Sequence, residues 1–353
     1  MAPGFLLRFG MADPRLGERA LYLLARTLCA VPSSAQLALG GGPITIDGQT
    51  LAPELMLLLR ATARMDRGLP TGTEIGAYRQ AQDRGARVAG GRADKLVTKD
   101  VPIGSLRARH YPAADGAPLL VYLHGGGFVF GDLDSHDVPC RLLARHAGVH
   151  LLAIEYRLSP EHVYPIAVDD TLAALRWAQE NAASLGADPG RVGIGGDSAG
   201  GNLAAVIAQM TRDDRPPAAQ VLIYPAISRR RAWRSVELFG KDFFLSSDAI
   251  EWFFLQYLGA DYVRPETPDP RIDPLENPDL GRLAPALVIT AGFDPLRDEG
   301  EAYGAALRDA GNVAVTRRFP SLLHGFINMA GISAACRDAV VELAGATRML
   351  FGA

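Results

Sequence analysis

The chain contains little cysteine, little lysine and no long apolar run. Its three cysteines, Cys29, Cys140 and Cys336, are far apart in the sequence. This spacing excludes both a disulfide scaffold and a zinc site built from paired CxxC motifs, so we expect buried, reduced thiols. Only three of the 36 basic residues are lysines, and we interpret this arginine bias as genome composition rather than chemistry.

Charge and hydropathy exclude two further classes. The 36 basic residues face 39 acidic ones, so there is no basic excess to neutralise phosphates, and we expect no nucleic-acid partner. No apolar run approaches 18 residues, and Arg8, Arg15 and Glu18 interrupt the start of the chain. We therefore expect neither a signal peptide nor an integral membrane segment, and a cytoplasmic protein. The alternative is that the N-terminal helices, within Met1 to Leu28, make peripheral contact with a membrane or a partner.

The length of 353 residues predicts two domains, or one large α/β domain with an elaboration. The first part is predicted to be helical, around Arg15 to Ala30 and Pro53 to Arg67. After Lys95, short apolar runs alternate with helical patterns, which indicates a largely parallel sheet. The expected strands are 119–123, 150–155, 191–195, 221–224, 286–290 and 314–319.

One interval, 228–282, interrupts this alternation. It contains no strong strand pattern, one helix expected near Asp248 to Leu258, and a proline-rich loop. Long insertions between strands are most often functional lids or caps. We therefore predict a cap insertion at 228–282, an N-terminal helical part of the cap at 1–75, and a catalytic core formed by 76–227 and 283–353.

The most informative segment surrounds Ser198, where a short apolar strand leads into Gly196-Asp-Ser-Ala-Gly200 and then into a helical pattern. This is the context of a nucleophile elbow, in which a sharp turn tolerates only small residues two positions either side of the serine. A dinucleotide-binding fingerprint starting at Gly193 is the alternative, but its third glycine would fall on Ser198. The first reading predicts a serine nucleophile.

A second motif, His124-Gly-Gly-Gly-Phe128, follows the apolar strand at 119–123. Three consecutive glycines allow backbone amides to turn toward a bound carbonyl oxygen, as an oxyanion hole requires. A flexible loop is the alternative. The position of the triplet, after a strand and ahead of the serine elbow, favours the oxyanion hole, and we expect His124 to support the loop.

An α/β-hydrolase places its triad in the order serine, carboxylate, histidine. Of the seven histidines only His324 follows Ser198, so His324 is the predicted base. Asp294 comes just after the apolar strand 286–290, where α/β folds collect functional groups. We predict Asp294 as the carboxylate, with Asp298 as the alternative, and we expect Asp298 and Glu299 to cap the next helix.

With these motifs placed, the sequence resembles the hormone-sensitive-lipase-like esterases, the bacterial family IV of the α/β-hydrolases. Tyr156-Arg-Leu-Ser-Pro-Glu-His162, Ala167-Val-Asp-Asp and His324-Gly-Phe also carry the resemblance, which runs from about Leu119 to Ile327. It implies an eight-stranded, mostly parallel sheet with a helical cap. It also implies that the oxyanion amides belong to Gly126, Gly127 and Ala199.

The predicted function is hydrolysis of small carboxylic esters with short to medium acyl chains, through an acyl-enzyme on Ser198. The alternatives are an amidase or peptidase using the same triad, and a non-catalytic ligand receptor, which retention of His324 argues against. No HExxH motif or clustered ligand set is present, so we expect neither a metal nor another cofactor. A homodimer is compatible with the sequence.

Overall fold

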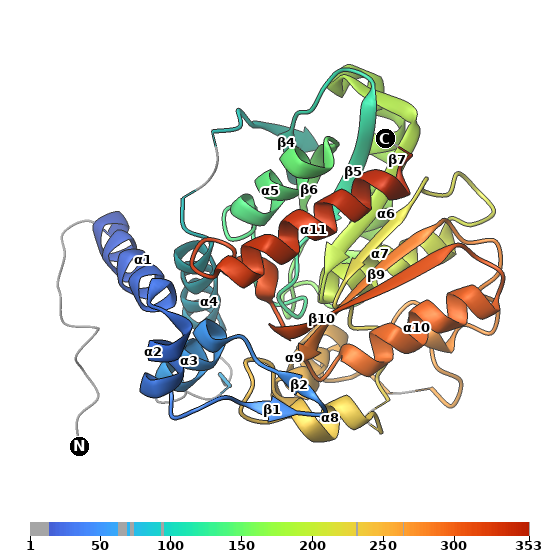
Figure 1. The fold of residues 1–353 in the computed structure, drawn as a ribbon. Helices are drawn as coiled ribbons and strands as arrows, with labels where there is room; N and C mark the ends of the chain where they lie inside the picture. The colour runs from blue at the N-terminus through green and yellow to red at the C-terminus, as the bar shows by residue number, and fades with distance from the viewer. Residues whose placement is uncertain are drawn as a thin grey trace.

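The structure is a computed structural model and describes residues 14–62, 69–70, 74–92, 95–230, 232–263 and 265–352. Its centre is a sheet of eight strands in the order β10-β9-β8-β7-β5-β6-β4-β3 (Figure 1). Pairings β3–β4 and β4–β6 are antiparallel, and the other pairings in the sheet are parallel. The strands are β3 (Lys99–Ile103), β4 (Leu106–Tyr111), β5 (Ala117–Leu123), β6 (His150–Glu155), β7 (Ala187–Asp197), β8 (Gln220–Ile223), β9 (Ala286–Phe293) and β10 (Ala314–Leu323). The predicted fold class is confirmed.

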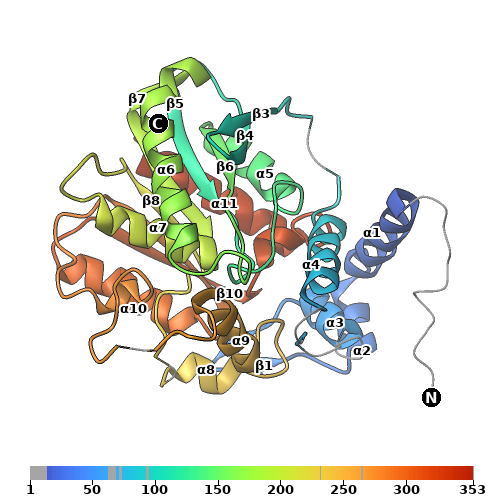
Figure 2. The ribbon, with the colours of Figure 1, turned by 180° about the vertical axis from the view of Figure 1, so that it is seen from behind.

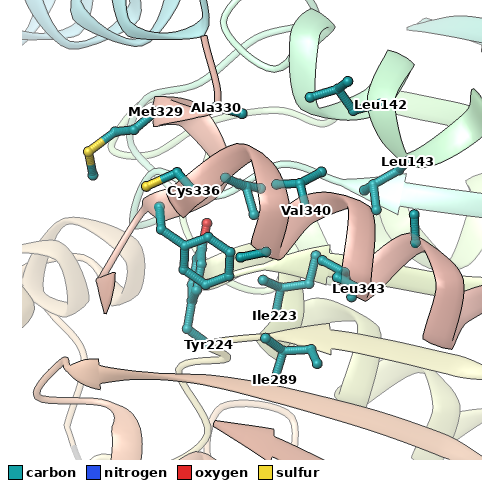
Figure 3. Packing of buried hydrophobic residues seen from close by; sticks show 14 of the residues in the cluster. Leu142, Leu143, Ile223, Tyr224, Ile289, Met329, Ala330, Cys336, Val340 and Leu343 are labelled. Atoms are coloured by element: carbon teal, nitrogen blue, oxygen red, sulfur yellow. The ribbon is translucent and has the colours of Figure 1, made fainter. Parts of the chain in front are cut away.

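Helices cover both faces of this sheet (Figures 1 and 2). One face packs against α5 (Asp137–Ala147) and α11 (Ala334–Leu350), whose apolar side chains meet those of β8 and β9 in one buried cluster. The other face packs against α6 (Ile166–Asn181), α7 (Ala199–Met210) and α10 (Arg297–Asp309). Figure 3 shows part of the first cluster, with Val340 and Leu343 of α11 packed near Ile223 and Ile289 of the sheet. The sheet is therefore buried on both sides, which is why its central strands are almost wholly apolar.

The cysteines are free thiols in the part of the chain that the structure describes. Cys140 and Cys336 are buried within the first cluster, and Cys29 is partly buried. Burial raises the pKa of Cys336 to about 12, so this thiol stays protonated at neutral pH.

The N-terminal part forms a separate group of helices beside the sheet (Figures 1 and 2). It contains α1 (Pro14–Ala30), α2 (Ser33–Leu39), the small hairpin β1 (Thr45–Ile46) and β2 (Gln49–Thr50), α3 (Pro53–Thr62) and α4 (Ile75–Gly90). The predicted helix from Pro53 is observed as far as Thr62, and its remainder to Arg67 lies outside the described residues, as do residues 1–13 of the predicted contact segment. Helix α4 has no counterpart among the sequence-based predictions, because its arginines and glycines obscure an apolar stripe.

Interval 228–282 contains α8 (Arg234–Phe239), α9 (Ser247–Leu258) and the short 3-10 helix η4 (Pro274–Glu276), and none of its described residues belongs to a strand. Two further 3-10 helices are η3 (Ala182–Leu185) and η5 (Phe326–Met329). Ser246 caps α9, since its hydroxyl accepts a hydrogen bond from the amide of Ala249 at 3.1 Å.

Four parallel strands end at the same edge of the sheet. β5 ends at Leu123, β7 at Asp197, β9 at Phe293 and β10 at Leu323. The segments that follow these strands carry the glycine triplet, Ser198, Asp294 and His324, respectively. The parallel topology therefore brings four motifs, which are far apart in the sequence, to one edge.

Candidate active site

Ser198 occupies a sharp turn between β7 and α7. Its backbone φ of 54° and ψ of −117° lie in a region that residues other than glycine rarely adopt. A side-chain carbon added at Gly196 or at Gly200 would collide with the carbonyl oxygen of Leu123. The turn therefore requires glycine at both positions, as a nucleophile elbow does.

The predicted histidine and carboxylate lie next to this serine. His324 Nε2 is 3.0 Å from Ser198 Oγ, and His324 Nδ1 is 2.8 Å from Oδ2 of Asp294. Asp294 is fully buried, and its other carboxylate oxygen accepts a hydrogen bond from the amide of Leu296 at 2.8 Å. When Nδ1–H donates to this carboxylate, Nε2 carries the lone pair that can accept the hydroxyl proton of Ser198.

The alternative carboxylate, Asp298, lies elsewhere. Its Oδ2 accepts a hydrogen bond from the amide of Ser235 at 2.8 Å, and Glu299 Oε1 accepts one from the amide of Ile227 at 2.7 Å. The N-cap of α10 is Leu296. The prediction that Asp298 and Glu299 cap this helix is therefore wrong, because both side chains instead hold the segment that enters the 228–282 insertion.

The glycine loop presents backbone amides beside the serine. Gly126 and Gly127 have φ values of 115° and 60°, which favour glycine. Within the described part of the chain, the amides of Gly126, Gly127 and Ala199 donate no hydrogen bond. The start of α7 packs against the end of β5, since a side-chain carbon at Gly200 would collide with the carbonyls of Leu123 and His124. The three amides are thus available to a ligand at this edge.

Asp197, the residue before the serine, joins the elbow to the glycine loop. This buried carboxylate accepts hydrogen bonds from the Tyr122 hydroxyl at 2.8 Å and from the Gly125 amide at 2.9 Å, and His136 Nε2 is 3.5 Å away. Burial acts to raise the pKa of Asp197, but His136 and the hydrogen-bond donors outweigh burial and hold it below its usual value. Sequence reasoning missed this role, although a carboxylate inside an otherwise apolar strand-turn motif is a signal for it.

His124 lies behind the same loop, as expected for a supporting residue. Its Nδ1 is 2.8 Å from the carbonyl oxygen of Gly125, and its ring stacks on Tyr156 with centroids 4.3 Å apart. Burial, reinforced by the neighbouring His136, lowers the pKa of His124 to about 4. The imidazole is therefore neutral at physiological pH, and its Nδ1–H can donate to the loop.

Tyr224 packs against the predicted base. Its ring centroid is 4.7 Å from that of His324, and its hydroxyl is 3.4 Å from Oδ2 of Asp197. Burial raises the pKa of the Tyr224 hydroxyl well above its usual value, so the hydroxyl remains a hydrogen-bond donor. Figure 3 shows this side chain beside the apolar cluster of α11 and the central strands. The sequence contained no signal for this contact.

The described residues contain neither a metal-ligating cluster nor a membrane-spanning helix. No three histidine, cysteine, aspartate or glutamate side chains there are grouped so as to hold a metal ion. None of the helices described is both long enough and apolar enough to span a membrane.

The parallel sheet, the strand-turn-helix at Ser198 and the order of the three polar side chains define the class of the α/β-hydrolases. The family profile described as alpha/beta hydrolase fold matches residues 120–328. Among curated proteins, the carboxylic ester hydrolase LipN of Mycobacterium tuberculosis is 42% identical over 97% of this chain and 96% of its own length. The ethyl acetate hydrolase of Pseudomonas putida is 40% identical over 72% of this chain and 84% of its own length.

Solved structures give the same result. The ester hydrolase EH1AB1 from the metagenome of Lake Arreo superposes with a TM-score of 0.78 at 37% identity, covering 86% of this chain and 100% of that one. The hyperthermophilic esterase of Pyrobaculum calidifontis gives a TM-score of 0.77 at 36% identity, covering 86% of this chain and 99% of that one. The chain therefore belongs to the α/β-hydrolase family, and within it to the hormone-sensitive-lipase-like carboxylic ester hydrolases.

Proposed function

We propose that this carboxylic ester hydrolase uses Ser198 as its nucleophile, His324 as its general base and Asp294 to orient the histidine. The observation that carries the proposal is the unbroken chain of contacts from Ser198 Oγ through His324 to the buried carboxylate of Asp294, at 3.0 and 2.8 Å. Such a chain, with the carboxylate excluded from water, is the geometry that activates a serine hydroxyl.

The reaction proceeds in two halves. Ser198 Oγ attacks the ester carbonyl while its proton moves to His324 Nε2, and the carbonyl oxygen becomes an oxyanion facing the amides of Gly126, Gly127 and Ala199. His324 then gives the proton to the departing alcohol, which leaves an acyl-enzyme on Ser198. Water repeats the sequence with the same base and releases the carboxylic acid.

The test is replacement of Ser198 by alanine. With p-nitrophenyl butyrate we expect kcat to fall roughly 10⁶-fold, because the triad acts as a unit. An aryl phosphonate should add one phosphonyl group to the wild type and none to Ser198→Ala, by intact mass. Ser184→Ala, which alters an exposed serine, is the control and should label like the wild type. A Ser198→Ala enzyme that keeps more than a few per cent of the turnover would overturn the assignment.

We also propose that the preferred substrates carry short to medium acyl chains, up to about eight carbons. Helix α9 of the 228–282 insertion supports this proposal. Its Phe253 ring lies directly over the backbone of Gly127, since a side-chain carbon added at Gly127 would fall on that ring. Phe253 also packs on Phe130 and Trp252, with centroids 5.9 and 5.2 Å apart. Aromatic side chains at this position limit the space beside the proposed oxyanion.

A series of p-nitrophenyl esters from acetyl to palmitoyl tests this limit. We expect Phe253→Ala to shift the optimum toward longer chains, because a ring volume beside Gly127 is removed. Phe244→Ala is the matched control, since Phe244 lies in the same insertion with 43% of its surface exposed, and it should leave the optimum unchanged. Faster hydrolysis of palmitoyl than of butyryl esters by the wild type would contradict the proposal.

The proposed division of the chain has a cap made of 1–75 and 228–282, and a catalytic core made of 76–227 and 283–353. The first boundary falls at the start of α4, which packs on α1 and begins at Ile75. A homodimer, a cytoplasmic location and peripheral membrane contact through the N-terminal helices stay predictions. Sedimentation equilibrium and a vesicle flotation assay would test assembly and membrane contact.

A further inference from the structure

The directions of the two proposed oxyanion donors in the glycine loop, the amides of Gly126 and Gly127, depend on the carbonyl groups that precede them. In a planar trans peptide the N–H points away from the C=O of the same unit. The direction of the Gly126 amide is therefore set by whatever holds the Gly125 carbonyl, and the direction of the Gly127 amide by whatever holds the Gly126 carbonyl. The Gly125 carbonyl is held by His124 Nδ1 at 2.8 Å.

A tight turn holds the Gly126 carbonyl. Its oxygen accepts hydrogen bonds from the amides of Val129 and Phe130, each at 3.0 Å. A rotation of the Gly126–Gly127 peptide would break both bonds. The direction of the Gly127 amide therefore depends on where the backbone of 129–131 is placed.

Helix α4 places that backbone. Arg79 Nε donates to the carbonyl of Val129 at 2.5 Å, and Asp83 Oδ1 accepts from the amide of Gly131 at 2.9 Å. Arg79 and Asp83 are four residues apart and so share one face of the helix. On the same helix, the ring of Tyr78 meets Phe130 edge-on, with centroids 6.1 Å apart. Val129, Phe130 and Gly131 are thus each contacted by α4.

The contacts of Arg79 extend to a second loop. Its guanidinium binds both oxygens of Glu161, at 2.8 and 2.5 Å, and donates to the carbonyl of Ser159 at 2.6 Å. The amide of Ser159 in turn donates to the carbonyl of Phe128 at 2.9 Å. One partly buried arginine therefore fastens both sides of the turn, and a planar guanidinium with five donors is suited to this task.

The helix itself is fixed. α4 lies between α1 and the core (Figures 1 and 2), and it packs on η5, just after His324 in the chain. A side-chain carbon at Gly331 would collide with the carbonyl of Gly90, the last residue of α4. These contacts hold α4, and with it Arg79 and Asp83, in place.

We propose that Arg79 and Asp83 of α4 are positioning residues for catalysis, which hold the 129–131 backbone so that the Gly127 amide faces the oxyanion. The proposal rests on the proposed oxyanion role of the glycine loop. It gives helix α4 a part in the rate of the chemical step.

The first test removes the Asp83 acceptor. In Asp83→Ala we expect kcat to fall about 10- to 100-fold, since a small misplacement of a preorganised group is costly. KM should stay within about twofold, because the ground-state carbonyl uses the hole weakly. Asp83→Asn keeps an oxygen that can accept from Gly131 and should restore kcat to within about threefold of the wild type.

The second test keeps the proposal falsifiable if Asp83→Ala does not fold. Arg79→Met retains the apolar stem and removes every donor, and we expect a kcat loss of about 10-fold or more. The matched control is Arg84→Met on the same helix, because Arg84 pairs with Glu18 of α1 at 3.8 Å and, among the described residues, makes no hydrogen bond to the 129–131 backbone. Arg84→Met should keep wild-type kcat.

Inhibition by a trifluoromethyl ketone distinguishes a positioning role from a merely structural one, because its adduct requires the oxyanion hole. Ser198 Oγ adds to its carbonyl, the carbon–oxygen π electrons move onto the oxygen, and the serine proton moves to His324, so the adduct carries an oxyanion. Its inhibition constant should weaken in Asp83→Ala and Arg79→Met by the same factor as kcat/KM. Two results would overturn the proposal. One is an inhibition constant that rises only by the same factor as KM, and the other is a kcat within twofold of the wild type in both variants.

The same measurements separate this proposal from the one on which it rests. If Ser198→Ala keeps activity, the proposed triad fails, whatever Arg79 and Asp83 do. If Ser198→Ala is inactive while Asp83→Ala and Arg79→Met keep wild-type kcat, the triad stands and the positioning role of Arg79 and Asp83 fails.

Discussion

The carboxylate of Asp197 accepts a hydrogen bond from the amide of Gly125 at 2.9 Å, across 72 positions of the chain. One residue of the serine elbow thereby holds the first glycine of the loop that faces it. Gly125 must be glycine for this reason, because a side-chain carbon there would collide with the Asp197 carboxylate. The two motifs that dominate the sequence are joined by a single buried anion.

Replacing Asp197 by alanine should therefore affect both stability and rate. Tyr122, His136 and the Gly125 amide would lose their common acceptor inside the protein, which should cost about 3–5 kcal/mol of unfolding free energy. Asp197→Asn keeps one acceptor oxygen and should cost less. Urea unfolding measures the stability, and kcat of the folded fraction measures how far the glycine loop still supports catalysis. Unchanged urea midpoints for both variants would contradict this account.

Acid should weaken the fold through two neutral histidines. Burial, with His150 beside the first and His136 beside the second, lowers the pKa of His110 and of His124 to about 4. In the unfolded chain a histidine titrates near 6.5, so below that pH the unfolded state binds more protons. The stability that each neutral histidine contributes to the fold is fully present above about pH 6.5. It is lost as pH falls toward 4, by up to about 3 kcal/mol for each group.

Urea midpoints between pH 7.5 and 4.5 measure this loss. His110→Gln should flatten the curve, because His110 is paired with His150 at 3.0 Å inside the protein and glutamine does not titrate. His162→Gln, which changes an exposed histidine, is the control and should leave the slope unchanged. A stability that rises as the pH falls over this range would refute the assignment.

Asp294→Asn should separate orientation from nucleophilicity. Asparagine can occupy the same space, but its amide would favour the wrong tautomer of His324, and kcat should fall about 10³- to 10⁴-fold with little change in folding. Steady-state kinetics of both enzymes with p-nitrophenyl butyrate test this, and a folded variant that keeps more than about a tenth of the wild-type kcat would argue against this role of Asp294.

Gly127→Ala, which tests the oxyanion amide, requires a partner variant. The new side-chain carbon would meet the Phe253 ring, and the backbone φ of 60° disfavours a side chain. We expect kcat to fall about 10²-fold, as for loss of one oxyanion donor. Phe253→Ala removes the steric conflict with the ring, so the double variant, compared with Phe253→Ala alone, reports the effect of displacing the Gly127 backbone amide. Recovery of wild-type kcat in the double variant would assign the loss to crowding instead.

Much of the site is local in sequence. The glycine triplet after 119–123 and the elbow around Ser198 are contiguous motifs whose chemistry does not need a partner to be recognised. Strand β6 is observed at the predicted bounds, His150–Glu155, because a run of apolar residues between turns has few other solutions. Strands β3 and β4 went unpredicted, because β3, Lys99–Ile103, begins with two charged residues and contains a proline, and β4, Leu106–Tyr111, has no continuous apolar run.

By itself the sequence determined the class of fold, the enzyme class, and the serine and histidine whose roles are proposed, since each belongs to a short motif and the order along a parallel sheet is fixed. For the carboxylate it favoured Asp294 and left Asp298 as the alternative. Only the tertiary structure decided that Asp294 and not Asp298 meets His324, that Asp197 joins elbow and loop, and that Arg79 and Asp83 hold the turn behind Gly127. These relationships depend on hydrogen bonds between residues tens of positions apart. Their geometry exists only after the strands have paired and the helices have packed on them.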